Sequence, residues 1–149
     1  MDAKVRGLRP GLVIYRKRPQ QIGRLPDGAA VASGDTVQVS YVAAGNHHGV
    51  VVSADGSGVV TLHHPAQASG STQLLPRGEH PLPHAFQLDD APAFERFFFV
   101  TSARRPIDVA TVMAAAEAWA VDPSLDKARL PLTDELQQAS LTLRKETSR

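Results

Sequence analysis

The chain contains no cysteine among its 149 residues. Without thiols, a disulfide framework, a thiolate nucleophile and the usual zinc ribbons are all excluded. A reducing cytosol and an oxidising periplasm are equally compatible with this composition, so it leaves the compartment open. Aromatic residues are also few, at 5% of the chain. The aromatic side chains that a single-stranded nucleic-acid platform places between its basic residues are missing, with Tyr15 as the one candidate near a basic run.

Neither sign of charge dominates, because 16 basic residues face 15 acidic ones and the formal net charge is +1. So small a charge attracts neither nucleic acid nor anionic lipid to the molecule as a whole, and we expect no nucleic-acid partner. Long apolar runs are lacking too. The longest near the start, Leu12–Tyr15, is far too short for a signal peptide or a membrane span. We expect no direct membrane insertion by this chain.

The motifs of several catalytic classes are absent as well. The sequence contains no G-x-S-x-G, no G-x-x-x-x-G-K-[ST], no G-x-G-x-x-G and no H-E-x-x-H. These patterns carry a nucleophilic serine, bound phosphate, a dinucleotide and catalytic zinc respectively. Gly56-Ser57-Gly58 is typical of a hairpin turn, since no helix pattern follows it. We therefore expect no catalytic residue, no cofactor and no enzyme.

The residues that are present predict one β-rich domain over 1–149. A hydrophobic content of 42% is enough to bury a core in a chain of this length. Strict alternation over Val37–Val42 predicts a strand with one solvated face. The valine-rich runs Gly49–Ser53 and Val59–Leu62, joined by a turn over Asp55–Gly58, predict a more deeply buried hairpin.

The remaining patterns complete an antiparallel β-sandwich-like domain of about seven or eight strands, as the spacing of turns suggests. Further strands are expected at Leu8–Arg16, Ala29–Ala32, His84–Leu88, Phe94–Thr101 and in the tail 130–145. The apolar run Phe97–Val100 belongs in the centre of a sheet, because both of its faces need cover. Apolar residues at helical spacing from Val109 onward, after a candidate N-cap at Asp108, predict one amphipathic helix near the C-terminus.

Two segments are expected outside the packed elements. Residues 66–80 are rich in Ser, Gly, Gln and Pro and predict an exposed loop. Residues 1–6 resemble a linker remnant, so a longer native chain with a membrane span upstream stays open.

Six histidines raise the question of a metal. If the hairpin turn centres on Gly56 and Ser57, His48 and His63 lie diagonally on one face and His47 and His64 on the other. Zinc or nickel needs three or four ligands, and no carboxylate or thiol is placed to complete either pair. We expect no metal site, with His48 and His63 as the weak candidates, and a small metal-dependent enzyme as an alternative.

Charged clusters offer two further candidates. Asp89, Asp90 and Glu95 could bind Ca²⁺ or serve as paired acid and base, but Asp-Asp-Ala-Pro is also a good turn. The basic runs Arg16–Arg18 and Arg104–Arg105 would form a binding patch if the fold brought them together. The binding residues that we single out are His47, His48, His63, His64, Arg104 and Arg105.

Several stretches resemble a known family. They are Gly7–Pro10 with Val13–Arg16, Val39–Gly45, Val60–Pro65, Leu82–Pro92 and Phe94–Ser102. Together they look like the C-terminal domain of myxobacterial ActD-like proteins, which are similar to membrane-bound anti-sigma factors. In that family a zinc-binding segment and one membrane span precede the domain, and no catalytic residue is assigned. The resemblance implies an extracytoplasmic, periplasmic domain, with a cytoplasmic one as the alternative.

These observations lead to an expected function. We expect a non-catalytic sensor or protein-interaction domain that binds a protein partner at the histidine end of the hairpin and the neighbouring polar loop. A self-associating structural or scaffold protein is the other alternative. Composition and pattern do not specify the partner or the oligomeric state.

Overall fold

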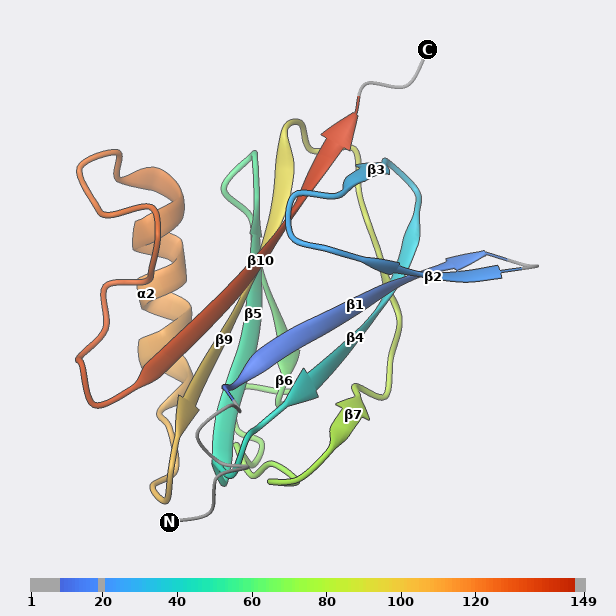
Figure 1. Ribbon diagram of the computed structural model, residues 1–149. Coiled ribbons are helices and arrows are strands. Elements are labelled where there is room, and N and C mark those ends of the chain that lie inside the picture. The colour runs from blue at the N-terminus through green and yellow to red at the C-terminus, as the bar shows by residue number, and fades with distance from the viewer. Residues whose placement is uncertain (1–8, 19–20, 147–149) are drawn as a thin grey trace.

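Two five-stranded sheets and one helix make up the computed structural model, which describes residues 9–18 and 21–146. The sheets pack face to face, and the helix covers the outer face of one of them (Figure 1). The mainly β, sandwich-like α+β class is confirmed, with 44% strand and 10% helix near the C-terminus. The expected start of the first strand at Leu8, and the linker at residues 1–6, lie outside the described residues.

The first sheet is antiparallel throughout and has the order β2-β1-β4-β7, with β8 pairing the other end of β4. Its strands are β1 (Gly11–Arg18), β2 (Gln21–Leu25), β4 (Thr36–Val42), β7 (Glu79–Pro81) and β8 (Phe86–Gln87). Strand β1 pairs with β4 along most of its length but meets β2 only from Ile14 onward. Among the described residues, the N-terminal half of β1 therefore has one unpaired edge.

The second sheet has the order β3-β10-β9-β5-β6. Its strands are β3 (Ala30–Ala32), β5 (His48–Asp55), β6 (Val60–His64), β9 (Phe94–Ser102) and β10 (Gln137–Glu146). Only the short pairing of β3 with β10 is parallel. The expected central position of Phe97–Val100 is confirmed, because β9 lies between β5 and β10 and these residues are fully buried.

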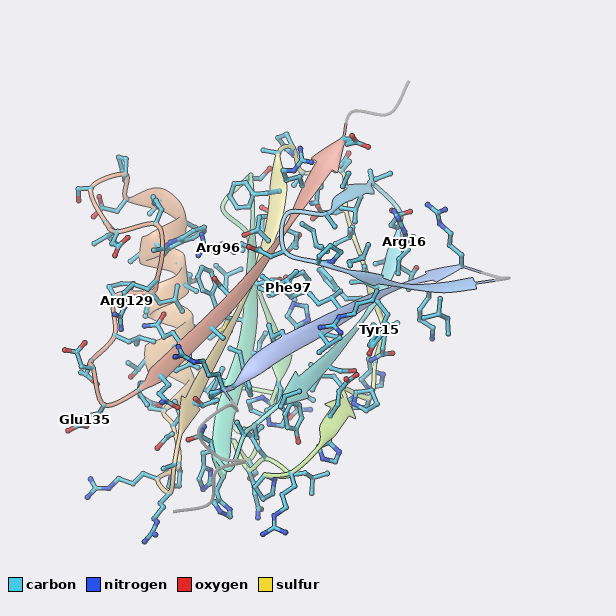
Figure 2. The ribbon with its side chains drawn as sticks, in the orientation of Figure 1. Tyr15, Arg16, Arg96, Phe97, Arg129 and Glu135 are labelled. Carbon is cyan, nitrogen blue, oxygen red and sulfur yellow. The ribbon has the colours of Figure 1, made fainter. Side chains whose placement is uncertain are left out.

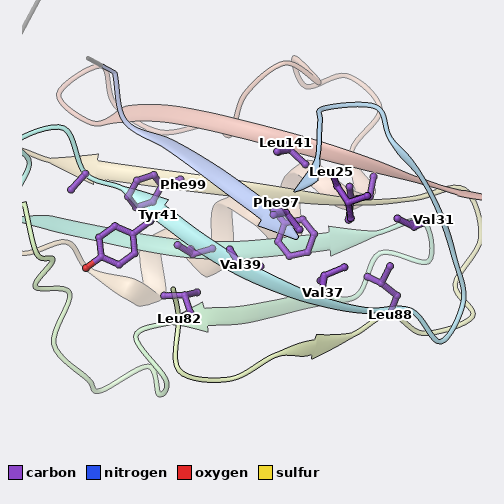
Figure 3. Packing of buried hydrophobic residues seen from close by; sticks show 14 of the residues in the cluster. Leu25, Val31, Val37, Val39, Tyr41, Leu82, Leu88, Phe97, Phe99 and Leu141 are labelled. Carbon is purple, nitrogen blue, oxygen red and sulfur yellow. The ribbon is translucent and has the colours of Figure 1, made fainter. Parts of the chain in front are cut away.

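Apolar side chains from both sheets fill the space between them (Figure 3). Alternate residues of each strand point inward, as the two-residue period of a strand requires. Val37, Val39 and Tyr41 of β4 face Phe97 and Phe99 of β9 across this space. Burial of this apolar surface from water is the main force that holds the two sheets together.

Helix α2 (Val109–Val121) packs on the outer face of the second sheet. Val109, Val112, Ala116 and Trp119 are buried there, at the spacing that the sequence indicated. Asp108 occupies the N-cap position, but its carboxylate accepts a hydrogen bond from the Thr111 hydroxyl and caps no backbone N–H. In the described residues, no helix is long and apolar enough to cross a membrane.

The structure differs from expectation in two places. Ten strands are described where seven or eight were expected, because β2 and β7 lie outside the segments that the sequence assigned to strands. The segment 66–80, expected as an exposed loop, is exposed at most of its positions, but two residues depart from this expectation. Thr72 and Leu74 are buried, because the backbone of 72–74 hydrogen-bonds to the start of β5 through Gly49 N–H, Leu74 N–H and a bridge at Gln73.

Candidate functional site

A β-bulge at the end of β6 decides where the histidines point. The hairpin pairs Ala54 with Val60 and Val52 with Leu62, but Val51 pairs with His64. One extra residue on β6 therefore stands opposite β5, and a bulge of this kind can turn both of its residues toward one face. His63 packs against Phe86 and Phe97, and the His64 ring lies near Tyr41, so both face the space between the sheets.

His48 lies on the opposite face of the same sheet. Its Nδ1 is 2.9 Å from the Thr72 hydroxyl, and that hydroxyl also accepts a hydrogen bond from the N–H of Ile107 beside helix α2. The expected pairing of His48 with His63 on one face is therefore wrong. The hairpin register is shifted by one residue from the expected one, and a one-residue shift moves every side chain to the other face.

His63 is held neutral by burial. Its Nε2 is 2.8 Å from the hydroxyl of Ser53, which is fully buried. Desolvation disfavours the imidazolium and lowers the pKa of His63 from 6.5 to about 4. Burial also lowers the pKa of His64, partly offset by its hydrogen bond to the backbone at Gln73. Both imidazoles are therefore neutral at pH 7.

The four hairpin histidines do not converge on an ion. His47 is exposed and contributes its backbone to the contacts with Ala103 and Leu74. Across residues 9–18 and 21–146, the only three histidine or carboxylate side chains close enough to share a cation are Asp55, Asp89 and Glu95. His48 and His63 therefore form no metal site with each other in this fold.

The acidic cluster closes one end of the sandwich around a lysine. Asp89 and Glu95 come together as expected, with Asp55 in the place that the sequence suggested for Asp90. The Lys145 ammonium lies 2.9 Å from Asp89 Oδ1 and 3.4 Å from Glu95 Oε1, and its side chain is only 4% exposed. Lys145 supplies the positive charge that this cluster requires.

The pKa values of the two carboxylates beside Lys145 are shifted in opposite directions, down for Asp89 and up for Glu95. A hydrogen bond from Lys145, followed by one from the N–H of Ala91, holds the pKa of Asp89 below its usual value. Burial raises the pKa of Glu95, against hydrogen bonding from Ser53 and the charge of Lys145. Through Ser53, Glu95 is connected to His63 in one buried polar chain. This chain lies in the core, and among the described residues Glu95 Oε1 has no hydrogen-bond partner beyond its ion pair with Lys145.

The basic runs do not form one patch. Arg16 lies beside Asp35 at 3.3 Å, on the side of the molecule away from α2 (Figure 2). Arg104 and Arg105 are exposed after β9 and line a hollow of about 550 Å³ together with Glu135, which Figure 2 shows near α2. The condition for a joint patch is therefore not met.

A wide hollow runs along the start of β10. It has a volume of about 1080 Å³. Its floor is Gln137–Ser140. One wall comes from the layer of the first sheet, with Arg9, Pro10 and 44–46, and the other from the segment that follows α2, with Ala128, Arg129 and Asp134. We call this hollow the β10 groove.

Within the part of the chain that the structure describes, one edge of β10 is unpaired in the groove. Thr142 N–H donates to Asp27 Oδ1 at 2.7 Å, Gly28 N–H donates to Thr142 O, and Arg144 N–H donates to Ala29 O. Even-numbered residues of β10 therefore direct their backbone groups away from β9. By the same alternation, N–H and C=O of Gln138 and Ser140 point into the groove, where no hydrogen bond to them is found among the described residues.

Three groups of the site escaped sequence reasoning. The inward position of Lys145 could have been predicted, since Lys145 continues the alternation of the inward-facing Leu141 and Leu143. Ser53 had none, because its partners lie on other strands. The free edge of β10 also had none, because it depends on where the pairing with 28–32 stops.

Comparisons of the whole chain with protein-family models, with curated proteins and with solved structures find no match.

Proposed function

We propose that this chain is a non-catalytic protein-interaction domain of the sensor type, which binds a partner in the β10 groove. The observation that carries the proposal is the strand edge at Gln138 and Ser140, which has no pairing partner among the described residues, on the floor of the β10 groove. A free row of backbone donors and acceptors is a template for another chain. The histidine end of the hairpin gives the proposal less support, because His63 and His64 face the core.

The distribution of titratable groups supports the same proposal. Glu95, Lys145 and His63 are buried and engaged with one another or with Ser53. The groove contains arginine, amide and hydroxyl side chains and one carboxylate, Asp134, which lies 3.8 Å from Arg129. A binding surface needs no paired acid and base, whereas general acid–base catalysis does. The family resemblance favours the same assignment and adds a regulatory output on the periplasmic side of a membrane.

The test is capture of a partner with a groove variant as control. The tagged chain is exposed to lysate and envelope fractions of the source organism beside Arg9→Glu/Arg129→Glu and, as a matched control, Lys17→Glu/Arg24→Glu on the β1–β2 hairpin. We expect one protein that the wild type and the hairpin variant retain and the groove variant loses. Isothermal titration with that purified protein then gives the affinity of each variant.

Other outcomes of this experiment contradict the proposal. Retention of the same protein by all three chains places the interface elsewhere. A stable oligomer of the chain, with no other protein bound, favours the self-associating scaffold. Turnover of a substrate by the purified chain would contradict the assignment of a non-catalytic role.

A further inference from the structure

The free edge of β10 specifies the form of the partner as well as its position. We infer that the β10 groove binds an extended, acidic peptide segment of a partner protein, which adds as a short strand to β10. The inference rests on the proposed function and deepens it. Its first support is the backbone of Gln138 and Ser140, which offers two N–H donors and two C=O acceptors to an incoming strand.

The shape of the groove selects a single strand. The β10 edge lies between two walls, with Pro10 from the layer of the first sheet on one side and Ala128 from the segment after α2 on the other. A second copy of this chain would carry the same two walls beside its own β10, so the two edges could not approach to the ~4.8 Å of a paired sheet. An isolated extended segment has no such walls and fits between them.

The length of the binding segment follows from where pairing of β10 begins. Asp27 and Gly28 occupy the edge at Thr142, so they end the groove there. The strand starts at Gln137. The free stretch therefore accommodates about five residues, or roughly 16 Å at the rise of a β-strand. A volume of about 1080 Å³ also exceeds the roughly 300–1,000 Å³ of pockets for small molecules.

The charges beside the edge select acidic side chains. Arg9 and Arg129 line the two walls, and Arg104 and Arg105 line the adjoining hollow. Asp134 already lies beside Arg129, and the carboxylate of Asp108 is engaged by Thr111. Glu135 lines the adjoining hollow too, so four arginines stand against three carboxylates and the two linings together carry a net charge of +1, with Arg9 as the arginine that has no carboxylate beside it in the groove lining. Such exposed charges raise the association rate and set specificity more than they raise affinity.

The experiment titrates the isotope-labelled chain with a synthetic peptide of about nine residues, alternating threonine and valine with glutamate at each end. Amide resonances are followed by NMR, and the dissociation constant is taken from the shifts. We expect shifts and slowed hydrogen exchange at Gln138 and Ser140, while Thr142, whose N–H is already bonded to Asp27, keeps its exchange rate.

Two controls separate strand addition from other binding. The same peptide N-methylated along its central residues keeps its side chains and loses its backbone donors, and we expect it not to bind. Ser140→Pro removes an N–H that faces the groove and is expected to weaken binding about tenfold or more. Ser140→Ala loses the same hydroxyl, which accepts a hydrogen bond from Arg96, but keeps the N–H, and is expected to bind more tightly than Ser140→Pro.

Charge is tested with a lysine-ended peptide. We expect weaker binding than that of the glutamate-ended peptide at low salt, and the reverse order on Arg9→Glu/Arg129→Glu. Binding of the N-methylated peptide as tight as that of the parent, or shifts that avoid Gln138 and Ser140, overturns the inference, as does no shift at millimolar peptide. Should a captured partner bind outside the groove, the inference fails and the interaction role survives. If the peptide adds to β10 and no partner exists, the proposed function fails instead.

Discussion

Gly56 shows how much a single missing side chain can decide. It lies in the exposed turn between β5 and β6, and a Cβ built on it would stand 1.9 Å from the carbonyl oxygen of Pro92. That contact joins the β5–β6 turn to the connection that enters β9, where Gly56 N–H also donates to Phe94 O. Because the obstacle is backbone, the close approach requires glycine at a position that exposure alone would call tolerant.

We expect Gly56→Ala to destabilise the fold by about 2–3 kcal/mol, since the turn and the Pro92 backbone must separate to admit a methyl group. Urea denaturation at pH 7 measures the change. The matched control is Gly23→Ala in β2, where nothing lies within 4 Å of the new Cβ, with an expected effect within about 0.5 kcal/mol. Equal effects at both positions would refute this account.

The buried imidazole of His63 makes stability depend on pH. Its folded-state pKa of about 4 lies below the unfolded value of 6.5. Above pH 6.5 the imidazole of His63 is neutral in both the folded and the unfolded state, so it causes no loss of stability. As the pH falls from 6.5 toward 4, the unfolded state takes up the proton first and stability is lost. We expect the wild type to lose about 1–2 kcal/mol more than His63→Gln between pH 7.5 and pH 5.

The same urea titrations at the two pH values provide the measurement for His63. The glutamine that replaces it in the variant does not titrate, and His64, present in both chains, contributes equally to both. A loss of stability that is identical in the two chains would show that His63 is protonated without penalty in the folded state.

At the scale of elements, Arg96 fastens the segment after α2 to the outer face of the second sheet. Its Nη2 donates to Ala128 O and to the Ser140 hydroxyl, each at 2.9 Å. Its guanidinium lies over the rings of Phe98 and Trp119, at 5.1 and 5.6 Å from their centroids. Figure 2 shows it between β9 and this segment. Arginine suits the position because a planar fork can stack and donate at once.

We expect Arg96→Lys to loosen residues 126–132, at a cost of about 1–2 kcal/mol, because lysine retains the charge and loses the fork. Hydrogen–deuterium exchange should rise in this segment and stay unchanged in β4. Arg129→Lys, an exposed arginine whose closest acid is 3.8 Å away, is the control and should behave as the wild type. Unchanged exchange at 126–132 in Arg96→Lys would contradict the role of Arg96.

The sequence was most informative about elements with a strong period. Alternation located β4, continuous apolar runs located β5 and β9, and helical spacing located α2 with its end at Asp122. Strands β2 and β7 were not predicted, because β7 is only three residues long and the apolar Ile22 and Leu25 of β2 are three positions apart, off the two-residue period of a strand. The bulge at His63 and His64 left no local signal either, and it overturned the geometry expected for the histidines.

At the scale of the molecule, the two ends of the sandwich differ. One end is closed by Lys145 with Asp89, Glu95 and Asp55, and the other is left open along β10. Part of the closed end could be predicted from the sequence, because Asp89 and Glu95 are only six positions apart and form a visible acidic cluster. Lys145 comes from the far end of the chain, so its part in the cluster, like the unpaired edge of β10, depends on the tertiary fold.

We expect Lys145→Met to destabilise the protein by about 3–5 kcal/mol at pH 7, because it leaves Glu95 buried without its cation. The carboxylate that remains then has a folded pKa raised above its unfolded value. Its neutral form favours folding at low pH, and that stability is lost as the pH rises, so the deficit should shrink at pH 5.

The double variant Lys145→Met/Glu95→Gln should recover part of the lost stability at pH 7, because an amide replaces the unpaired charge. Lys17→Met, an exposed lysine of β1, is the control and should change stability by less than about 0.5 kcal/mol. Equal stability of the single and double variants, measured by urea denaturation, would argue against a buried charge as the cause.

The extra residue of β6 also marks where the length of this chain can change. A chain one residue shorter at 63–64 keeps the pairs from Val52–Leu62 to Ala54–Val60, which lie on the turn side of the bulge, and returns Val51 to one-for-one pairing. Deletion elsewhere within β5 or β6 would move the side chains beyond it to the wrong face. In an alignment of related chains, a single-residue gap in this hairpin should therefore fall at the bulge.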